Sequence, residues 1–162
     1  MIKDKIKPPQ ELKRIVRRLK MQRKRVAFTN GCFDILHRGH VRYLEKAKLA
    51  ADILIVGLNS DQSVRRIKGR NRPINSLRER MEIVASLEST DFITYFNENT
   101  PKRLIKELRP NLLIKGGDWK KKDIVGRDII ESYGGKAKTI AYIKGYSTSA
   151  AIERVCKGVH AK

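Results

Sequence analysis

Two histidines three residues apart, His37 and His40, are the side chains of this sequence best suited to chemistry. They follow an apolar run, Val26 to Phe28, and a glycine, Gly31, and they stand where a helical pattern begins. Because residues at positions i and i+3 lie on one side of a helix, we expect both imidazoles to face the same ligand. Imidazole titrates near neutral pH and donates hydrogen bonds to phosphate oxygens. The pair therefore predicts two matched donors at a phosphorus centre.

The turn before these histidines also suits a phosphate group. A glycine in the turn permits a tight bend and a close approach of the ligand to the backbone. The N-terminus of the following helix offers free N–H groups and a partial positive charge. We expect the cradle to be formed, mostly through backbone groups, by Thr29, Asn30, Gly31, Cys32 and Phe33.

Other interpretations of these residues stay open. The two histidines could instead be surface side chains or metal ligands, but a zinc site needs a third ligand, and His160 is the only further histidine. Asp34 either orders the turn through Asx-type hydrogen bonds, which we favour, or contacts the substrate. Cys32 is expected to be a small buried residue, since no histidine is placed in the sequence to activate it as a nucleophile.

Strands and helices that could position these residues alternate along the chain. Apolar runs predict strands at 26–29, 52–60, 91–96, 111–118 and 138–142. Helical spacing, capping residues and prolines predict helices at 9–20, 40–51, 77–87, 101–108, 125–132 and from 147 onward. The basic segment 59–73 is expected to be a loop. The alternation predicts an α/β fold, with a parallel sheet of about five strands, helices on both faces and an additional N-terminal helix.

The composition of the chain limits the number of domains, the compartment and the type of partner. The chain has 162 residues, 40% of them hydrophobic, which fits one domain at 26–157 with a basic arm at 1–25 and a tail at 158–162. No apolar run approaches the roughly 20 residues that a membrane span needs, and the N-terminus lacks the apolar core of a signal peptide. Two cysteines make no disulfide framework, so we expect a cytoplasmic protein. The formal charge of +20 predicts an anionic partner, although part of it is expected to be solvated surface.

Further candidates follow from the sheet. Ligands of parallel sheets bind beyond the carboxyl ends of the strands. The later strand exits are rich in glycines, hydroxyls and charges, and we expect their residues to bind the nucleotide, namely Lys115, Gly116, Gly117, Asp118, Ser147 and Thr148. Helix capping accounts for Ser147 without a ligand, whereas Thr148 is the better candidate for a nucleotide contact. Trp119 could stack on a base or pack against a neighbouring helix.

The same segments resemble a known family. "GCFDILHRGH" is similar to the G-x-F-D…H-x-G-H signature of the nucleotidyltransferase superfamily that includes glycerol-phosphate cytidylyltransferases. The resemblance to D-glycero-β-D-manno-heptose 1-phosphate adenylyltransferases rests on "LNSDQSV", "KGRNRPI", "NENTPKRLIKELRPNLLIKGGDW", "IVGRDIIESYGG" and "GYSTSAAIERV". It covers roughly residues 25–157, so nearly the whole chain.

This resemblance implies a Rossmann-like sheet, ATP, Mg²⁺ and a sugar 1-phosphate acceptor in the formation of ADP-heptose for lipopolysaccharide. It also implies a homodimer and a heptose 7-phosphate kinase carried by a separate protein, with neither nucleic acid nor a membrane as the main partner. The implied reaction is an in-line attack on the α-phosphorus of ATP, with His37, His40 and Lys68 catalytic and Gly39 at the nucleotide. Without the resemblance, Lys68 would be expected to be a solvated loop lysine. The implied substrate-binding residues are Asn59, Asp61 and Arg72.

Two alternatives are weighed against this function. A cytidylyltransferase acting on glycerol phosphate or a similar alcohol phosphate is the enzymatic one, but those enzymes carry arginine and glutamate where this sequence has Tyr142 and Lys144. A basic nucleic-acid-binding module would explain the net charge, but the sequence contains no zinc-finger spacing and no helix-turn-helix pattern. It would also leave the glycines, hydroxyls and histidines at the strand exits unexplained.

Overall fold

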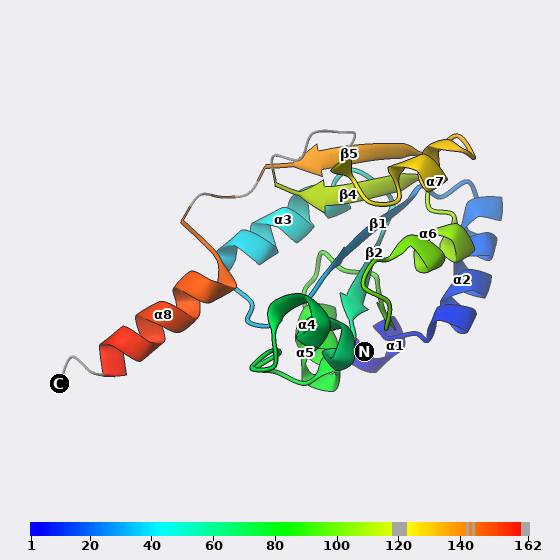
Figure 1. Ribbon diagram of the computed structural model, residues 1–162. Coiled ribbons are helices and arrows are strands. Elements are labelled where there is room, and N and C mark those ends of the chain that lie inside the picture. Colours follow the sequence, from blue (N-terminus) through cyan, green and yellow to red (C-terminus); the bar gives the residue numbers. More distant parts are fainter. Residues whose placement is uncertain (118–122, 142, 144, 160–162) are drawn as a thin grey trace.

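A five-stranded parallel sheet with the strand order β3-β2-β1-β4-β5 forms the centre of the protein (Figure 1). The computed structural model describes residues 1–117, 123–141, 143 and 145–159. The strands are β1 (Val26–Gly31), β2 (Ile53–Asn59), β3 (Phe92–Phe96), β4 (Leu112–Gly116) and β5 (Lys136–Ile140). The helices are α1 (Ile2–Lys5), α2 (Pro9–Met21), α3 (Arg38–Lys48), α4 (Asp61–Lys68), α5 (Leu77–Ala85), α6 (Lys102–Leu108), α7 (Arg127–Glu131) and α8 (Thr148–Val159). The predicted fold class is confirmed.

The sheet reverses its direction of growth at β1. The chain first builds outward through β2 and β3, and then returns to place β4 on the other side of β1. β1 pairs in parallel with β2 along its whole length, and with β4 through Ala27 and Phe28. The connections that follow β1 and β4 therefore leave the sheet on either side of a crevice, which is where ligands of such sheets bind.

Alternating side chains divide the core into two layers. Phe28 joins the cluster that contains residues of α2, α6 and α7, whereas its neighbour Ala27 joins the cluster of α3 and α5. Successive residues of a strand point to opposite faces, so continuous apolar runs such as that of β2 are buried on both sides. The first strand is therefore packed on both faces, and it ends at the predicted phosphate cradle.

The N-terminal segment packs against this sheet. Leu12 and Val16 of α2 are fully buried beside Phe28 and Leu104. Ahead of α2, the Lys7 N–H donates to the carbonyl of Ile93 on the edge strand β3 at 2.8 Å. Four basic residues of α2 are exposed on the other side of the helix, namely Lys13, Arg14, Arg17 and Arg18, so its apolar stripe contributes to the core while these charges remain solvated.

Replacing Leu12 with alanine is expected to lower the free energy of unfolding by about 2–5 kcal/mol, because it removes a fully buried side chain and leaves a cavity. Urea denaturation followed by circular dichroism measures the change. The matched control is Lys13→Ala on the exposed face of the same helix, which we expect to change stability by at most about 0.5 kcal/mol. Equal stability of the Leu12 variant and the wild type would contradict the packing of α2.

Two helices differ from the sequence-based expectation. The segment expected as a loop at 59–73 contains α4, whose first turn is capped by Ser60 accepting from the N–H of Ser63 at 3.1 Å. Lys68 is thus the last residue of a helix, followed by Gly69 with φ 97°, and not a loop residue. The short helix α1 was also not predicted. In contrast, the predicted capping box of Ser76 and Glu79 at the start of α5 is confirmed.

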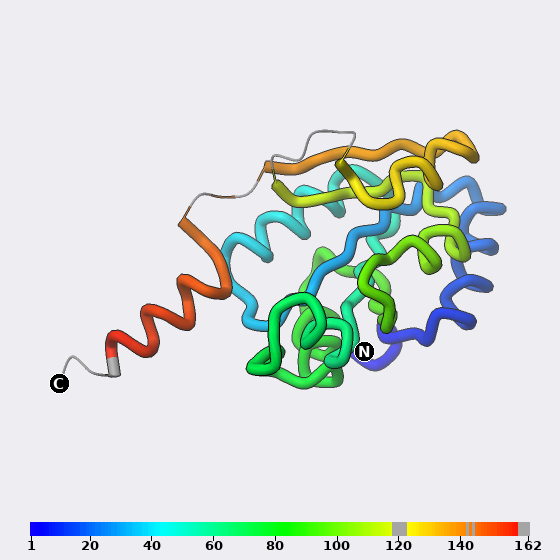
Figure 2. Tube along the Cα trace, viewed as in Figure 1, coloured from blue at the N-terminus to red at the C-terminus, as the bar shows by residue number. Residues whose placement is uncertain are grey.

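The last helix, α8, projects away from the sheet, as the red end of the tube in Figure 2 shows. Its first turn nevertheless lies near α3, because the Thr148 hydroxyl donates to the carbonyl of Ile35 at 3.4 Å. The predicted cap is confirmed, since the Ser147 hydroxyl accepts from the N–H of Ala150 at 3.1 Å. Within the described ranges, no helix is long and apolar enough to cross a membrane.

Candidate active site

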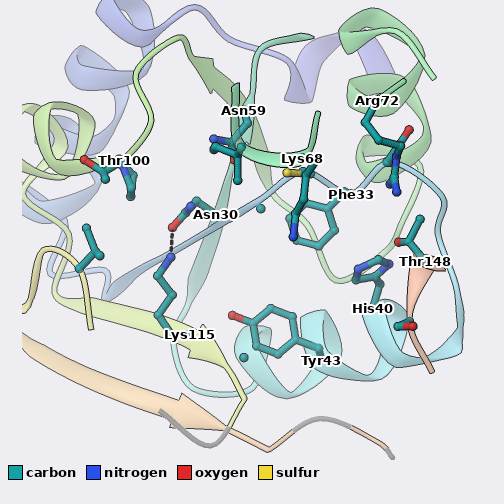
Figure 3. Close-up of a pocket in the computed structure, with 18 of the residues that line it drawn as sticks. Asn30, Phe33, His40, Tyr43, Asn59, Lys68, Arg72, Thr100, Lys115 and Thr148 are labelled. Atoms are coloured by element: carbon teal, nitrogen blue, oxygen red, sulfur yellow. Dashed lines mark hydrogen bonds and ion pairs between the residues drawn. The ribbon is translucent and has the colours of Figure 1, made fainter. Parts of the chain in front are cut away.

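A cleft of about 670 Å³ opens at the carboxyl ends of β1 and β4 (Figure 3). It lies where the strand order reverses, as the predicted fold requires. The predicted site residues that line it are Asn30, Gly31, Cys32, Phe33, His37, His40, Asn59, Lys68, Arg72, Lys115, Gly116, Ser147 and Thr148. Residues separated by more than 100 positions in the chain thus share one cavity.

Four other predicted residues are not among those that line the cleft. Thr29 is fully buried, with its hydroxyl 2.6 Å from that of Tyr43. Gly39 is buried in α3. Gly117 has a φ of 110°, and its N–H donates to the carbonyl of Ile140. The carboxylate of Asp61 pairs with an arginine that is described below. Asp118, like Trp119, Tyr142, Lys144 and His160, lies outside the described residues.

The two histidines stack on one another at the start of α3. His37 is the N-cap residue, in an extended conformation, and His40 lies in the first turn. Their ring centroids are 3.8 Å apart, with 19° between the ring planes. Among the described residues no side chain caps the helix, and the N–H of His40 donates to the carbonyl of His37 at 2.9 Å, so the helix start offers a ligand the N–H groups that precede His40. The expected juxtaposition of the two imidazoles with a helix N-terminus is present.

A glycine makes this stack possible. A Cβ atom at Gly39 would lie 3.0 Å from Nδ1 of His37 and 3.1 Å from Cβ of Tyr146, closer than most side-chain contacts. The absence of a side chain lets the segment before α8 pack over α3, with the rings of Tyr146 and His37 6.4 Å apart. Because Gly39 has no side chain, it leaves room for the imidazole of His37 and for Tyr146.

Both histidines are held in the neutral form in the free protein. Burial lowers the pKa of His40 to about 4, the neighbouring His37 adds to this shift, and a backbone hydrogen bond with Ile35 opposes it. Burial and the positive charge of Arg154 lower the pKa of His37. The Nδ1 atoms of both rings are buried without a hydrogen-bond partner among the described residues. An anionic ligand would favour the protonated form of each ring, since opposite charge raises the pKa of an imidazole.

The lowered pKa of His40, about 4 against an ordinary value near 6.5, makes stability depend on pH. Between these two values the unfolded chain takes up a proton that the folded protein does not, so stability is complete above about pH 6.5 and falls as the pH drops toward 4. A shift of this size corresponds to about 3 kcal/mol. We expect the stability difference between wild type and His40→Asn, measured by urea denaturation, to shift by up to this amount in favour of the variant from pH 7 to pH 4. A pH-independent difference would contradict the burial of a neutral His40.

Asp34 anchors a distant loop to the phosphate cradle. Its carboxylate is buried and accepts hydrogen bonds from Nε of Arg72 at 2.6 Å and from the backbone N–H groups of Ile74 and Asn75, each at 2.9 Å. Burial alone would raise the pKa of Asp34, but these backbone and guanidinium donors outweigh it and lower the pKa. The favoured ordering role is therefore present, although Asp34 orders residues 72–75 and not its own turn.

Arg80 is a residue of the site that sequence analysis missed. Its side chain is fully buried on α5, and it donates to the carbonyl oxygens of Cys32 at 2.6 Å and Asn59 at 2.9 Å, which belong to the exits of β1 and β2. It also donates to the carbonyl of Asn75 at 3.1 Å and to the carboxylate of Asp61 at 2.7 Å. One guanidinium thus ties together three walls of the cleft. In the sequence, Arg80 follows two charged residues within the predicted helix 77–87, so nothing in the local pattern indicates that its side chain is buried.

The comparison with known families now decides the classification. The sequence profile described as cytidylyltransferase-like matches residues 28–154, from the first strand to the last helix. The chain belongs to the cytidylyltransferase-like family. The predicted membership in this nucleotidyltransferase superfamily is therefore confirmed, and the matched region contains every cleft residue named above.

Curated relatives in this family are longer than the chain. It is 49% identical to the bifunctional protein HldE of Geotalea uraniireducens over 154 residues, which cover 95% of this chain and 31% of that protein. It is 50% identical to the bifunctional protein HldE of Pasteurella multocida, over 90% of this chain and 30% of that protein. The chain thus spans about a third of the length of these relatives.

Solved structures share the fold of this chain. A lipopolysaccharide core biosynthesis protein from Thermoplasma volcanium superposes with a TM-score of 0.62 at 27% identity, covering 76% of this chain and 99% of that one. A pantoate–β-alanine ligase from Francisella tularensis, solved in complex with β-γ ATP and β-alanine, gives a TM-score of 0.58 at 16% identity over 94% of this chain and 78% of that one. At this identity the second likeness concerns the fold alone.

Proposed function

We propose that this chain transfers the adenylyl group of ATP to the phosphate of D-glycero-β-D-manno-heptose 1-phosphate, forming ADP-heptose and pyrophosphate. The observation that carries the proposal is the stacked pair of His37 and His40 at the uncapped start of α3, inside the cleft at the reversal of strand order. Support for the sugar phosphate comes from the sequence resemblance, from relatives named HldE and from a similar structure named for lipopolysaccharide core biosynthesis.

The reaction needs charge stabilisation more than covalent chemistry. An oxygen of the acceptor phosphate attacks the α-phosphorus of ATP, and the bond from this phosphorus to the bridging oxygen breaks, so pyrophosphate leaves with its electron pair. Negative charge therefore grows on the β-phosphate. His37 and His40, which are neutral before ATP binds, become better donors as the phosphates raise their pKa values.

Two cations beside the cleft complete the phosphate site. Lys68 ends α4 and is exposed, so its side chain can reach over a bound triphosphate. Arg72 is already fixed through its Nε by Asp34, which leaves its terminal nitrogens to meet the phosphates. We propose that these two side chains bind the β- and γ-phosphates from the side opposite α3.

We propose Mg²⁺ as the companion of ATP. Magnesium keeps several waters and usually takes one or two protein carboxylates together with phosphate oxygens, where it neutralises their charge. The described part of the chain contains no group of three acidic, histidine or cysteine side chains that could hold a metal by itself. Asp123 lines the cleft and is the candidate carboxylate, since the carboxylate of Asp34 already binds Arg72.

A pyrophosphate-release assay that crosses ATP and CTP with heptose 1-phosphate and glycerol phosphate tests the proposal. We expect turnover with ATP and heptose 1-phosphate. Turnover with CTP and glycerol phosphate alone would instead identify an alcohol-phosphate cytidylyltransferase, and absence of turnover in all four combinations would reject both.

We further propose that the protein acts in the cytoplasm as a homodimer, and that a kinase activity supplies its heptose phosphate substrate. The relatives are named bifunctional and are about three times as long, which supports a second activity outside the region they share with this chain. Light scattering at several protein concentrations tests the dimer.

A further inference from the structure

Lys115 at the end of β4 is a cation whose described hydrogen-bond partner is uncharged. Its side chain is partly buried in the cleft, and Nζ donates to Oδ1 of Asn30 at 2.6 Å, so its partner is a neutral amide. Burial lowers the pKa of Lys115 to about 8. Among the residues that the structure describes, no carboxylate lies within ion-pair distance of it. A buried ammonium group is costly unless an anion accompanies it, so this environment suits an anionic ligand.

The position of Lys115 separates it from the triphosphate site. In Figure 3, Lys115 and Asn30 lie on one side of the cleft and His40 with Thr148 on the other, while Phe33 and Lys68 lie between them. An in-line displacement places the attacking and leaving oxygens on opposite sides of the α-phosphorus. If pyrophosphate leaves toward the histidines, the attacking group enters from the side of Lys115.

The neighbours of Lys115 suit a sugar phosphate. Thr100, before α6, lines the same cleft and is exposed, and Figure 3 places it on this side, where its hydroxyl could meet a sugar hydroxyl. Asn30 holds the ammonium group in place without neutralising it. Both reactants are anions that repel each other in the free state. A fixed positive charge on the entering side therefore offsets this repulsion where the two phosphates must meet.

We propose that Lys115 binds the phosphate of the acceptor, and that it thereby selects phosphorylated over neutral sugars. This inference rests on the adenylyl transfer proposed above and assigns to Lys115 a contact different from the nucleotide contact expected from the sequence. A charge-assisted hydrogen bond of this kind accounts for about a 10- to 100-fold effect on binding.

The kinetic test compares Lys115→Met with Lys138→Met, a matched control on β5 whose side chain is exposed outside the cleft. We expect Lys115→Met to raise KM for heptose 1-phosphate by about 10- to 100-fold and to leave KM for ATP within about twofold of wild type. Lys138→Met should change neither. A rise in KM for ATP that equals or exceeds the rise for the acceptor would overturn the proposal in favour of a nucleotide contact. Circular dichroism checks that both variants are folded.

A second readout does not require turnover. In wild-type protein with isotopically labelled lysines, NMR titration should show one lysine with a pKa near 8, absent from Lys115→Met. Heptose 1-phosphate alone should raise this pKa, whereas ATP alone should leave it unchanged. The reverse pattern, or no response to either compound, contradicts the acceptor site. If the pKa responds to heptose 1-phosphate but no pyrophosphate is released with ATP, the adenylyl transfer fails while the anion site stands.

Discussion

Replacing either His37 or His40 with alanine is expected to lower kcat by about two to three orders of magnitude, the usual scale for losing an aligned donor at developing charge. The structure explains why the two variants should lose similar amounts of kcat. The rings stack at 3.8 Å on an uncapped helix start, so one phosphate group can contact both. Each ring also fixes the orientation of the other, and the double variant should therefore lose less than the product of the single losses.

Pyrophosphate release under saturating ATP and acceptor measures this effect. Arg42→Ala is the matched control, because Arg42 lies on the exposed side of α3, where it pairs with Glu45 at 2.8 Å. It should keep the activity of the wild type. Full turnover of both histidine variants, with native circular dichroism, would remove the assigned role and the observation on which the proposed function depends.

Replacing Arg80 with methionine is expected to lower the free energy of unfolding by about 3–5 kcal/mol, the range for breaking a buried charged contact. Methionine fills a similar volume but donates no hydrogen bond. The variant leaves the carbonyl oxygens of Cys32 and Asn59 without this donor and takes the guanidinium away from the carboxylate of Asp61. Because these groups belong to the exits of two strands, we also expect kcat to fall in the fraction that remains folded.

Arg78→Met is the matched control for Arg80. Arg78 lies two residues earlier on α5, is exposed, and pairs with Glu82 at 3.2 Å across one helical turn. Such surface pairs contribute about 0.5 kcal/mol or less, so urea denaturation should show little change. If Arg80→Met were as stable as Arg78→Met, the buried network of Arg80 would not hold the cleft together.

The proposed chemistry depends on how the protein balances its charges. The cleft contains Lys115, whose described partner is the neutral amide of Asn30, together with two imidazoles whose charged form is disfavoured by burial, so the free site is adapted to receive anions. Asp34 and Arg80 are paired instead, and they hold the walls in place. Binding and support are therefore carried by different charged residues, which is why the Arg80 and Lys115 variants should affect stability and KM, respectively.

The local pattern of the sequence determined most of the secondary structure and the location of the histidine pair. The spacing of apolar residues, the Ser76–Glu79 capping box and the glycine turn act over a few neighbouring positions, so they can be recognised without the fold. The helix α4 was not predicted, because its two arginines and its lysine obscure the apolar pattern of the buried face around Val64. The parallel sheet and the use of its carboxyl ends followed from the alternation of strands and helices.

Tertiary structure alone decided which distant residues meet. The return of β4 to the side of β1 brings Lys115 within 2.6 Å of Asn30, and the buried Asp34 captures the loop that carries Arg72. The burial of Arg80 likewise depends on four groups contributed by three separate segments of the chain, around Cys32, around Asn59 and Asp61, and at Asn75. No local periodicity encodes such contacts, because each depends on the free energy of burying a charge with partners that only the folded chain assembles.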